Sequence, residues 1–225
     1  MNQVTIKDKT SLPLIGEIID KLKEVKYFNK LDLIWEYNNV QIKEGDECKA
    51  AFLTNKGLFE PQVMYFELCN LPEMFQRMMN NIFWELLHEE SLANYIDNFV
   101  IPAKMMKELE EQTVQFLKIA EKYNLCFKWS KCNFNIEEIP ILGVVIGREQ
   151  VQMENKKVKA VKEWKTLTKI KEVESFSEFA NFYWQFIKNF SYTARSLNKL
   201  KGKKKWNWTE EHQEVFKELK DKITS

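Results

Sequence analysis

Hydrophobic residues recur along this chain at two spacings, and each spacing predicts a different kind of element. Steps of three and four residues, which place side chains on one face of a helix, fill several long stretches. The predicted helices are 15–25, 71–87, 104–122, 155–165, 172–188 and 209–223. In the second, Asn70 stands at the N-cap position and Pro72 just inside the start. Its methionine stripe favours core packing over a promiscuous binding face.

Short apolar runs between these helices predict strands. These runs are 27–33, 50–54, 59–64, 125–129, 132–136 and 140–146, together with the two arms of a hairpin at 91–101. A turn at 55–57 contains Gly57, and the later hairpin has Asp97 and Asn98 at a polar tip. Mixed helices with mostly hairpin-connected strands predict an α+β fold with an antiparallel sheet.

Composition narrows the class of protein. The 225 residues are 44% hydrophobic and 30% charged, enough for one or two ordinary soluble domains. The longest apolar run, Ile139 to Gly147, is far short of the roughly 20 residues that cross a bilayer. The first residues lack the apolar stretch of a signal peptide. We therefore expect no membrane partner and an intracellular protein, with the choice between cytoplasm and nucleus left open.

Cysteine and charge distribution add two expectations. Cys48, Cys69, Cys126 and Cys132 form no C-x-x-C pair, which favours reduced thiols over a zinc site. Residues 1–150 carry 17 Lys and Arg against 23 Asp and Glu, a balance of −6, whereas residues 151–225 carry 17 against 10, a balance of +7. A basic last third fits either a phosphate-binding surface or solvated helix faces.

Two carboxylates stand in apolar surroundings. Asp32 lies inside the predicted strand 27–33, and Asp97 lies at a hairpin tip. Acids against an apolar sheet are unfavourable unless they are paired or bound to metal. On adjacent antiparallel strands, they could share the divalent cations of nucleotidyl transfer. Spacing alone favours the plainer interpretation, in which Asp32 caps a turn and Asp97 is an ordinary hairpin acid.

Several motifs carry a family resemblance. The segment Met64-Tyr-Phe-Glu-Leu-Cys-Asn-Leu-Pro-Glu-Met-Phe-Gln is similar to M-P-F-G-L-x-N-x-P-x-x-F-Q, and Tyr95-Ile-Asp-Asn stands in the place of Y-x-D-D. Ile141-Leu-Gly-Val-Val-Ile is similar to F-L-G-H-x-I. Over nearly its whole length the chain resembles the reverse transcriptase of gypsy-type LTR retrotransposons, in a truncated and degenerate copy.

The resemblance implies a fold and an activity. It implies a right-hand polymerase, with partial fingers and palm at 1–146 and a thumb and connection region at 147–225 that leads toward an absent RNase H domain. The implied activity is RNA-directed DNA synthesis with Mg²⁺ at a two-metal site. The implied partners are an RNA or DNA template with a DNA primer, and dNTP. Members of this family are made as Pol polyproteins together with RNase H and integrase.

The same resemblance implies roles for individual residues. Asp32 and Asp97 are implied as metal ligands and catalytic residues, together with Asn98. The implied nucleotide-binding residues are Leu33, Tyr37, Phe66 and Glu67, with the Tyr37 ring crowding the sugar 2′ position. Leu142 and Gly143 are implied to abut the primer terminus as the primer grip.

Departures from the family pattern predict impaired activity. Asn98 replaces an aspartate and so removes a negative charge, and Glu67 replaces a glycine, which predicts strain or repulsion of phosphates. Trp35 and Glu36 replace small residues beside Asp32, and Met1 falls in the middle of the family's fingers region. Two alternatives stay open: a non-catalytic remnant that binds nucleic acid or protein, and a decaying genomic copy without a selected role.

Overall fold

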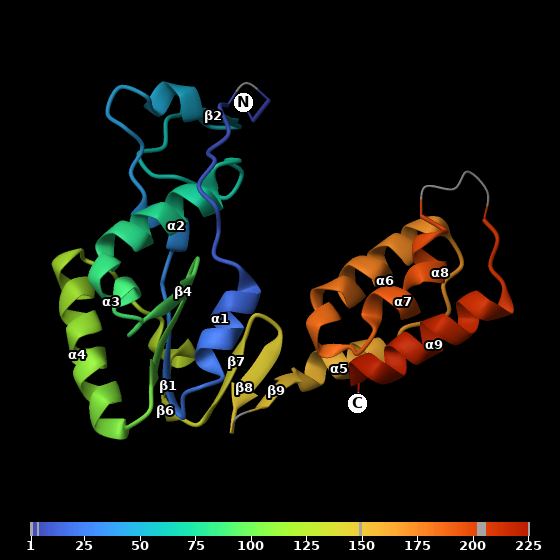
Figure 1. The fold of residues 1–225 in the computed structure, drawn as a ribbon. Coiled ribbons are helices and arrows are strands. Elements are labelled where there is room, and N and C mark those ends of the chain that lie inside the picture. Colours follow the sequence, from blue (N-terminus) through green and yellow to red (C-terminus); the bar gives the residue numbers. More distant parts are fainter. Residues whose placement is uncertain (1, 4, 149, 202–205, 225) are drawn as a thin grey trace. The chain divides into compact units, whose positions relative to one another are not determined.

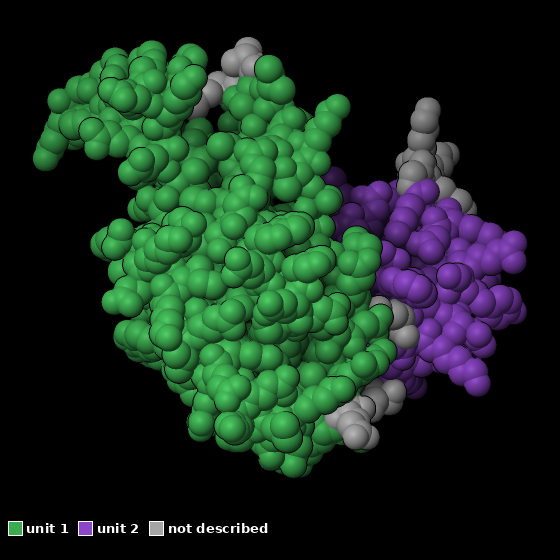
Figure 2. All heavy atoms as spheres, turned by 60° about the vertical axis from the view of Figure 1, so that its left-hand side comes forward, with its two compact units in different colours: residues 1–151 green, residues 152–225 purple. Residues whose placement is uncertain are grey.

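The structure is a computed structural model, and it describes residues 2–3, 5–148, 150–201 and 206–224. The chain divides into two compact units, Met1–Val151 and Gln152–Ser225 (Figure 2). Each unit has its own buried hydrophobic residues. None of the helices in the described part of the chain is long and apolar enough to cross a membrane.

The first unit is built on a four-stranded sheet in the order β4-β5-β1-β6 (Figure 1). Each pair of neighbouring strands in this sheet is antiparallel. Its strands are β1 (Tyr27–Asp32), β4 (Ala93–Tyr95), β5 (Asn98–Ala103) and β6 (Asn133–Ile136). The predicted α+β class with an antiparallel sheet is thereby confirmed.

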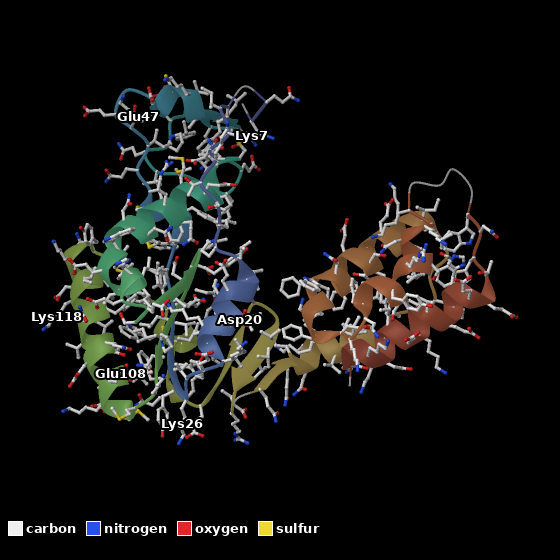
Figure 3. All side chains as sticks on the ribbon, viewed as in Figure 1. Lys7, Asp20, Lys26, Glu47, Glu108 and Lys118 are labelled. Atoms are coloured by element: carbon white, nitrogen blue, oxygen red, sulfur yellow. The ribbon has the colours of Figure 1, made fainter. Side chains whose placement is uncertain are left out.

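The first unit also contains four α-helices in its described residues: α1 (Ile15–Leu22), α2 (Leu71–Ile82), α3 (Trp84–His88) and α4 (Met106–Lys122). In the core, the Phe83 and Phe116 rings stack at 4.6 Å, and the Phe99 ring lies tilted against both at 5.4 and 5.5 Å. The outward side of α4 is polar, and Figure 3 shows Lys118 pointing away from the sheet.

The other strands in the described residues form two smaller sheets. A hairpin pairs β2 (Phe52–Thr54) with β3 (Gly57–Phe59), and a three-stranded sheet has the order β7-β8-β9. The latter consists of β7 (Glu138–Ile141), β8 (Val144–Gly147) and β9 (Gln150–Met153).

Beyond the last residues of β9, the elements of the second unit in the described part of the chain are helices. Its helices are α5 (Asn155–Lys162), α6 (Ile170–Phe182), α7 (Phe190–Thr193), α8 (Arg195–Asn198) and α9 (Glu210–Thr224). Phe176 packs edge-on against Phe216 at 4.7 Å and against Trp164 at 5.3 Å, which joins α6 to α9 and to the segment after α5.

Several sequence predictions need correction. The predicted strand at 59–64 ends at Phe59, and Val63 forms only an isolated bridge with Gln41. Residues 125–129 are not a strand, apart from a single bridge between Phe127 and Leu33. The long helix predicted at 71–87 is broken at Phe83.

The last third and one helix cap also differ from the predictions. The helix predicted at 172–188 ends at Phe182, and α7 and α8 were not predicted. The Asn70 side chain does not cap α2, because it donates to the Ile6 carbonyl at 2.7 Å and accepts from the Asp8 N–H at 3.1 Å. The sequence also predicts a lysine-rich loop at 201–205, and residues 202–205 of it lie outside the described part of the chain.

Candidate active site

Three of the candidate residues meet where β1 ends and β5 begins. Asp32 is the Cα partner of Asn98 in the antiparallel register, and Asp97 precedes Asn98 in the turn from β4. Side chains alternate between the faces of a sheet, so Asp32 and Asn98 project from the face opposite the core residues Leu31 and Phe99. Two acids 65 positions apart in the sequence thus come to one end of the sheet.

Asp32 lies in a partly enclosed environment. Its side chain is only 13% exposed, and Lys131 Nζ lies 3.4 Å from its Oδ1. Burial raises the pKa of the neighbouring Cys132 thiol above its usual range, and the negative charge of Asp32 adds to that rise. A carboxylate with so little access to water needs a positive partner, and Lys131 supplies one.

Asp97 has a partner within its own turn. The Asn98 side-chain amide donates to Asp97 Oδ1 at 2.9 Å, and both side chains are half-buried. An aspartate at position 98 could make no such hydrogen bond when ionised. The departure at Asn98 therefore removes one negative charge and also engages an oxygen of the carboxylate beside it.

Tyr37 and Phe66 form an aromatic pair in the first unit. Tyr37 lies in a 3₁₀ turn (Glu36–Asn39) and meets the Phe66 ring edge-on at 5.3 Å and the Phe75 ring at 5.7 Å. Phe66 is 78% exposed. Leu33 differs, since its side chain is 3% exposed within the core, so only its backbone could face a nucleotide.

The substitutions at Glu67 and Trp35 have different consequences from those predicted. Glu67 is exposed and is not among the described non-glycine residues with positive φ, so the predicted backbone strain at this position is wrong. Its negative charge remains. Trp35 carries the strain instead, with φ 53° and a ring that is 77% exposed. The Glu36 side chain is outside the described part of the structure.

Leu142 and Gly143 form the two-residue turn between β7 and β8. Their φ values are 49° and 84°, the pair of left-handed conformations that a tight hairpin turn of this kind requires. Lys30 of β1 donates to the Pro140 carbonyl at 2.9 Å and ties this hairpin to the strand that ends in Asp32.

Comparisons with known proteins show the family of this chain. The family described as reverse transcriptase (RNA-dependent DNA polymerase) matches residues 1–146. The chain belongs to the reverse transcriptase family. Among curated relatives it is 32% identical over 222 residues to the retrovirus-related Pol polyprotein from transposon 297 of Drosophila melanogaster. It is 29% identical over 215 residues to the transposon Tf2-7 polyprotein of Schizosaccharomyces pombe.

These matches cover 98% and 95% of this chain but only 21% and 16% of the two polyproteins. The chain therefore spans about a fifth or less of their length. The predicted reverse transcriptase region of an LTR retrotransposon is confirmed, and the gypsy type is consistent with these relatives.

Solved structures confirm the fold. A foamy viral protease-reverse transcriptase in complex with RNA/DNA hybrid superposes with a TM-score of 0.86 at 18% identity, over 99% of this chain and 30% of that one. A second structure of that protein, in complex with ds DNA, gives 0.89 at 17% identity, over 99% and 39%.

The oxygen donors at the end of the reverse transcriptase sheet fit the Mg²⁺ on which this family generally depends. The carboxylates of Asp32 and Asp97 and the Asn98 carbonyl are hard oxygen donors, and Mg²⁺ keeps several waters when it binds one or two carboxylates. No group of three or more His, Cys, Asp or Glu suited to a metal occurs among the residues that the structure describes. Two carboxylates and an amide are the donors that the sheet brings together here.

Sequence reasoning missed three residues that surround these acids. Lys131 gives no sequence signal, because nothing local distinguishes it from other surface lysines. Gln76 and Asn94 are buried polar residues that hold the turn before Asp97. Gln76 was visible as the last letter of the family motif, yet only its burial shows what it does.

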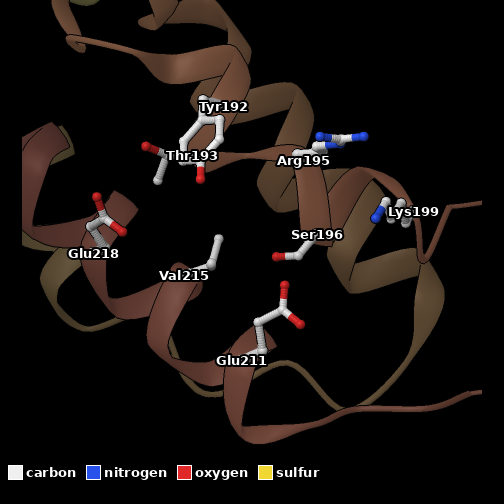
Figure 4. Close-up of a pocket in the computed structure, with 8 residues that line it drawn as sticks. All are labelled: Tyr192, Thr193, Arg195, Ser196, Lys199, Glu211, Val215 and Glu218. Carbon is white, nitrogen blue, oxygen red and sulfur yellow. The ribbon is translucent and has the colours of Figure 1, made fainter.

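The second unit has a pocket of its own (Figure 4). It measures about 300 Å³ and lies between α7, α8 and α9, with Arg195, Lys199 and Glu211 among its lining residues. The buried Ser196 hydroxyl lines it without a hydrogen-bond partner. None of the nine candidate residues named from the sequence lines this pocket.

Proposed function

We propose that this chain is a reverse transcriptase polymerase domain that binds primer–template nucleic acid and Mg²⁺ and performs nucleotidyl transfer only slowly. The observation that supports this proposal is the pairing of Asp32 with Asn98, because Asp97 directly precedes Asn98 at the same end of the sheet. Relatives with this fold include a protein whose structure was solved with an RNA/DNA hybrid.

The proposal gives each candidate residue a role. Asp32 and Asp97 would hold Mg²⁺, which when bound activates the attacking hydroxyl and stabilises the leaving oxygen. The Tyr37 ring, fixed edge-on against Phe75, would exclude a 2′-hydroxyl from the nucleotide sugar. The turn at Leu142 and Gly143 would contact the primer terminus.

Two features of the site would slow this chemistry. Asn98 removes a carboxylate, and Lys131 places a competing positive charge 3.4 Å from Asp32. A loss of about 2 kcal/mol of transition-state stabilisation would lower the rate by well over tenfold. Asn98→Asp alone is expected to raise activity only in part, since Lys131 and Glu67 remain.

Primer extension on an RNA template tests the proposal. The chain, Asn98→Asp and Asp32→Asn would each be assayed at high enzyme with Mg²⁺ and with Mn²⁺. We expect slow extension by the chain, faster extension by Asn98→Asp and none by Asp32→Asn. Absence of product from both the chain and Asn98→Asp would end the enzymatic proposal, and so would equal activity in Asp32→Asn.

A second candidate is a binding remnant without chemistry. The hydrogen bond from Asn98 to Asp97 and the ion pair between Lys131 and Asp32 favour it, because they satisfy both acids without metal. The basic last third would supply phosphate contacts in either case. A salt titration of binding to a primer–template duplex tests these contacts, since a slope near zero would rule them out. Primer extension separates the two candidates, because only the enzyme makes product.

A further inference from the structure

A buried amide lies beneath the turn that carries Asp97. Gln76 of α2 is fully buried, with Phe75 and Met79 as fully buried neighbours on the same helix. An uncompensated side-chain amide in such a place is strongly unfavourable. Gln76 is compensated, because its Oε1 accepts from the Ile96 N–H at 2.7 Å and its Nε2 donates to Asn80 Oδ1 at 2.9 Å and to Asn94 Oδ1.

The residue that Gln76 holds is in an unfavourable conformation. Ile96 has φ 56°, which is rare for a β-branched side chain because of contacts between its Cβ and the backbone. Such a conformation persists only where the surroundings enforce it. Asn94 also stabilises this conformation, since its Nδ2 donates to the Ile96 carbonyl at 3.0 Å. Side chains therefore hold both backbone polar groups of Ile96.

Asp97 follows Ile96 directly, so the conformation of Ile96 sets where the Asp97 carboxylate points. We propose that Gln76 is a positioning residue for Asp97, which acts through the Ile96 backbone and with Asn94. This inference rests on the proposed function in one respect, namely that Asp97 binds a divalent cation. The hydrogen bonds by which Gln76 and Asn94 hold the Ile96 backbone, here called the clamp, do not depend on that function.

The consequence for metal binding follows from geometry. Two carboxylates from different segments of the chain bind one ion well only when both are held in place before binding. Without Gln76, the Ile96 N–H would lose its buried partner and the turn could relax to a conformation with negative φ. That relaxation would redirect Asp97 away from Asp32 and so weaken the site without touching either acid.

The test uses the full chain and two matched variants. Gln76→Met keeps the length and apolar stem of the side chain but removes all three hydrogen bonds. Thr113→Val is the control, because it removes a buried hydroxyl away from the turn. That hydroxyl accepts from Asn29 Nδ2 of the same sheet at 2.7 Å and donates to the Leu109 carbonyl at 2.6 Å. The readouts are Mn²⁺ affinity by electron paramagnetic resonance, urea stability, and amide exchange at Ile96 and Asp97 by NMR.

We expect Gln76→Met to bind Mn²⁺ about tenfold more weakly than the chain itself, and its Ile96 amide to exchange at least about tenfold faster. Thr113→Val should lose similar stability and leave both properties within about twofold. Equal Mn²⁺ affinities and equal Ile96 exchange in the two variants would overturn the inference. A purely structural role for Gln76 would give that result.

Two further measurements keep the test decisive. If Gln76→Met does not fold, Gln76→Glu retains an oxygen for the Ile96 N–H and should keep slow Ile96 exchange. In the unaltered chain the Ile96 amide should be protected although it lies in a turn, and rapid exchange there would contradict the clamp. If the unaltered chain binds no Mn²⁺, the proposed function fails, while Ile96 exchange still decides the role of Gln76 in the turn.

Discussion

Replacing Asn98 with aspartate is expected to make the stability of this reverse transcriptase domain depend on divalent cations. In the chain as it stands, the Asn98 amide donates to Asp97 Oδ1 at 2.9 Å. The substitution removes that donor and places a second carboxylate at a similar distance. It does so at the end of the sheet where Asp32 already forms an ion pair with Lys131.

The size of the effect follows from this distance. Two unit charges about 3 Å apart repel by about 1.4 kcal/mol in water and by about 5.5 kcal/mol at an effective dielectric constant of 20. Both side chains are half-buried, so a repulsion of about 2–3 kcal/mol is expected, and the lost hydrogen bond adds about 1 kcal/mol. The free energy of unfolding of Asn98→Asp should therefore fall by about 3 kcal/mol without metal near neutral pH.

Urea denaturation with chelator and with saturating Mg²⁺ or Mn²⁺ measures both states. Metal bound by the new pair should restore most of the lost stability, whereas the unaltered chain should gain much less. Asn98→Ala serves as the control, since it removes the hydrogen bond without adding a charge. If Asn98→Asp matched Asn98→Ala in stability and showed no response to metal, the positions of these side chains would not be those described.

Three other substitutions probe the surroundings of the site. Lys131→Met should raise Mn²⁺ affinity by up to about fivefold, because it removes an ammonium whose ion pair with Asp32 is worth at most about 1 kcal/mol. An unchanged or weaker affinity in calorimetry would show that Lys131 does not compete with the cation for Asp32. Leu142→Asn should raise the free energy of unfolding by about 0.5–1 kcal/mol, because asparagine adopts positive φ more readily than leucine; a loss of stability in urea would count against the turn assigned here. Burial and the Asp32 charge raise the pKa of Cys132, so less thiolate is present at about pH 8 and alkylation should be slow. Asp32→Asn should lower that pKa and speed alkylation relative to Cys48, as followed by mass spectrometry, and an unchanged rate would show that the charge of Asp32 does not reach the thiol.

Local patterns predicted the central elements of the fold well. The strand that ends at Asp32, the hairpin that carries Asp97 and the helix α4 all have clear periodicity, and each formed close to its predicted bounds. The same reasoning missed α7 and α8, because helices of four residues are too short to show a hydrophobic period. It also extended a strand to Met64, where apolar residues pack into the core from a loop.

The site was predictable only as far as residue types and resemblance allowed. No pattern in one sequence shows that Asp32 pairs with Asn98, since strand register depends on contacts between distant segments. Nor could it show that Lys131 neutralises Asp32 or that Gln76 holds Ile96, because both depend on tertiary placement. Strain was predicted at Glu67 from a missing glycine, whereas the described non-glycine residues with positive φ include Trp35 and Ile96 but not Glu67.

Anomalous diffraction from crystals soaked in Mn²⁺ tests most directly whether the ends of β1 and β5 form a cation site. We predict a peak within coordination distance of the Asp32 and Asp97 carboxylates, with Lys131 Nζ moved away from Asp32 Oδ1, and no peak there in Asp97→Asn. A fully soaked crystal without a peak at this position, or with one that persists in Asp97→Asn, would contradict it.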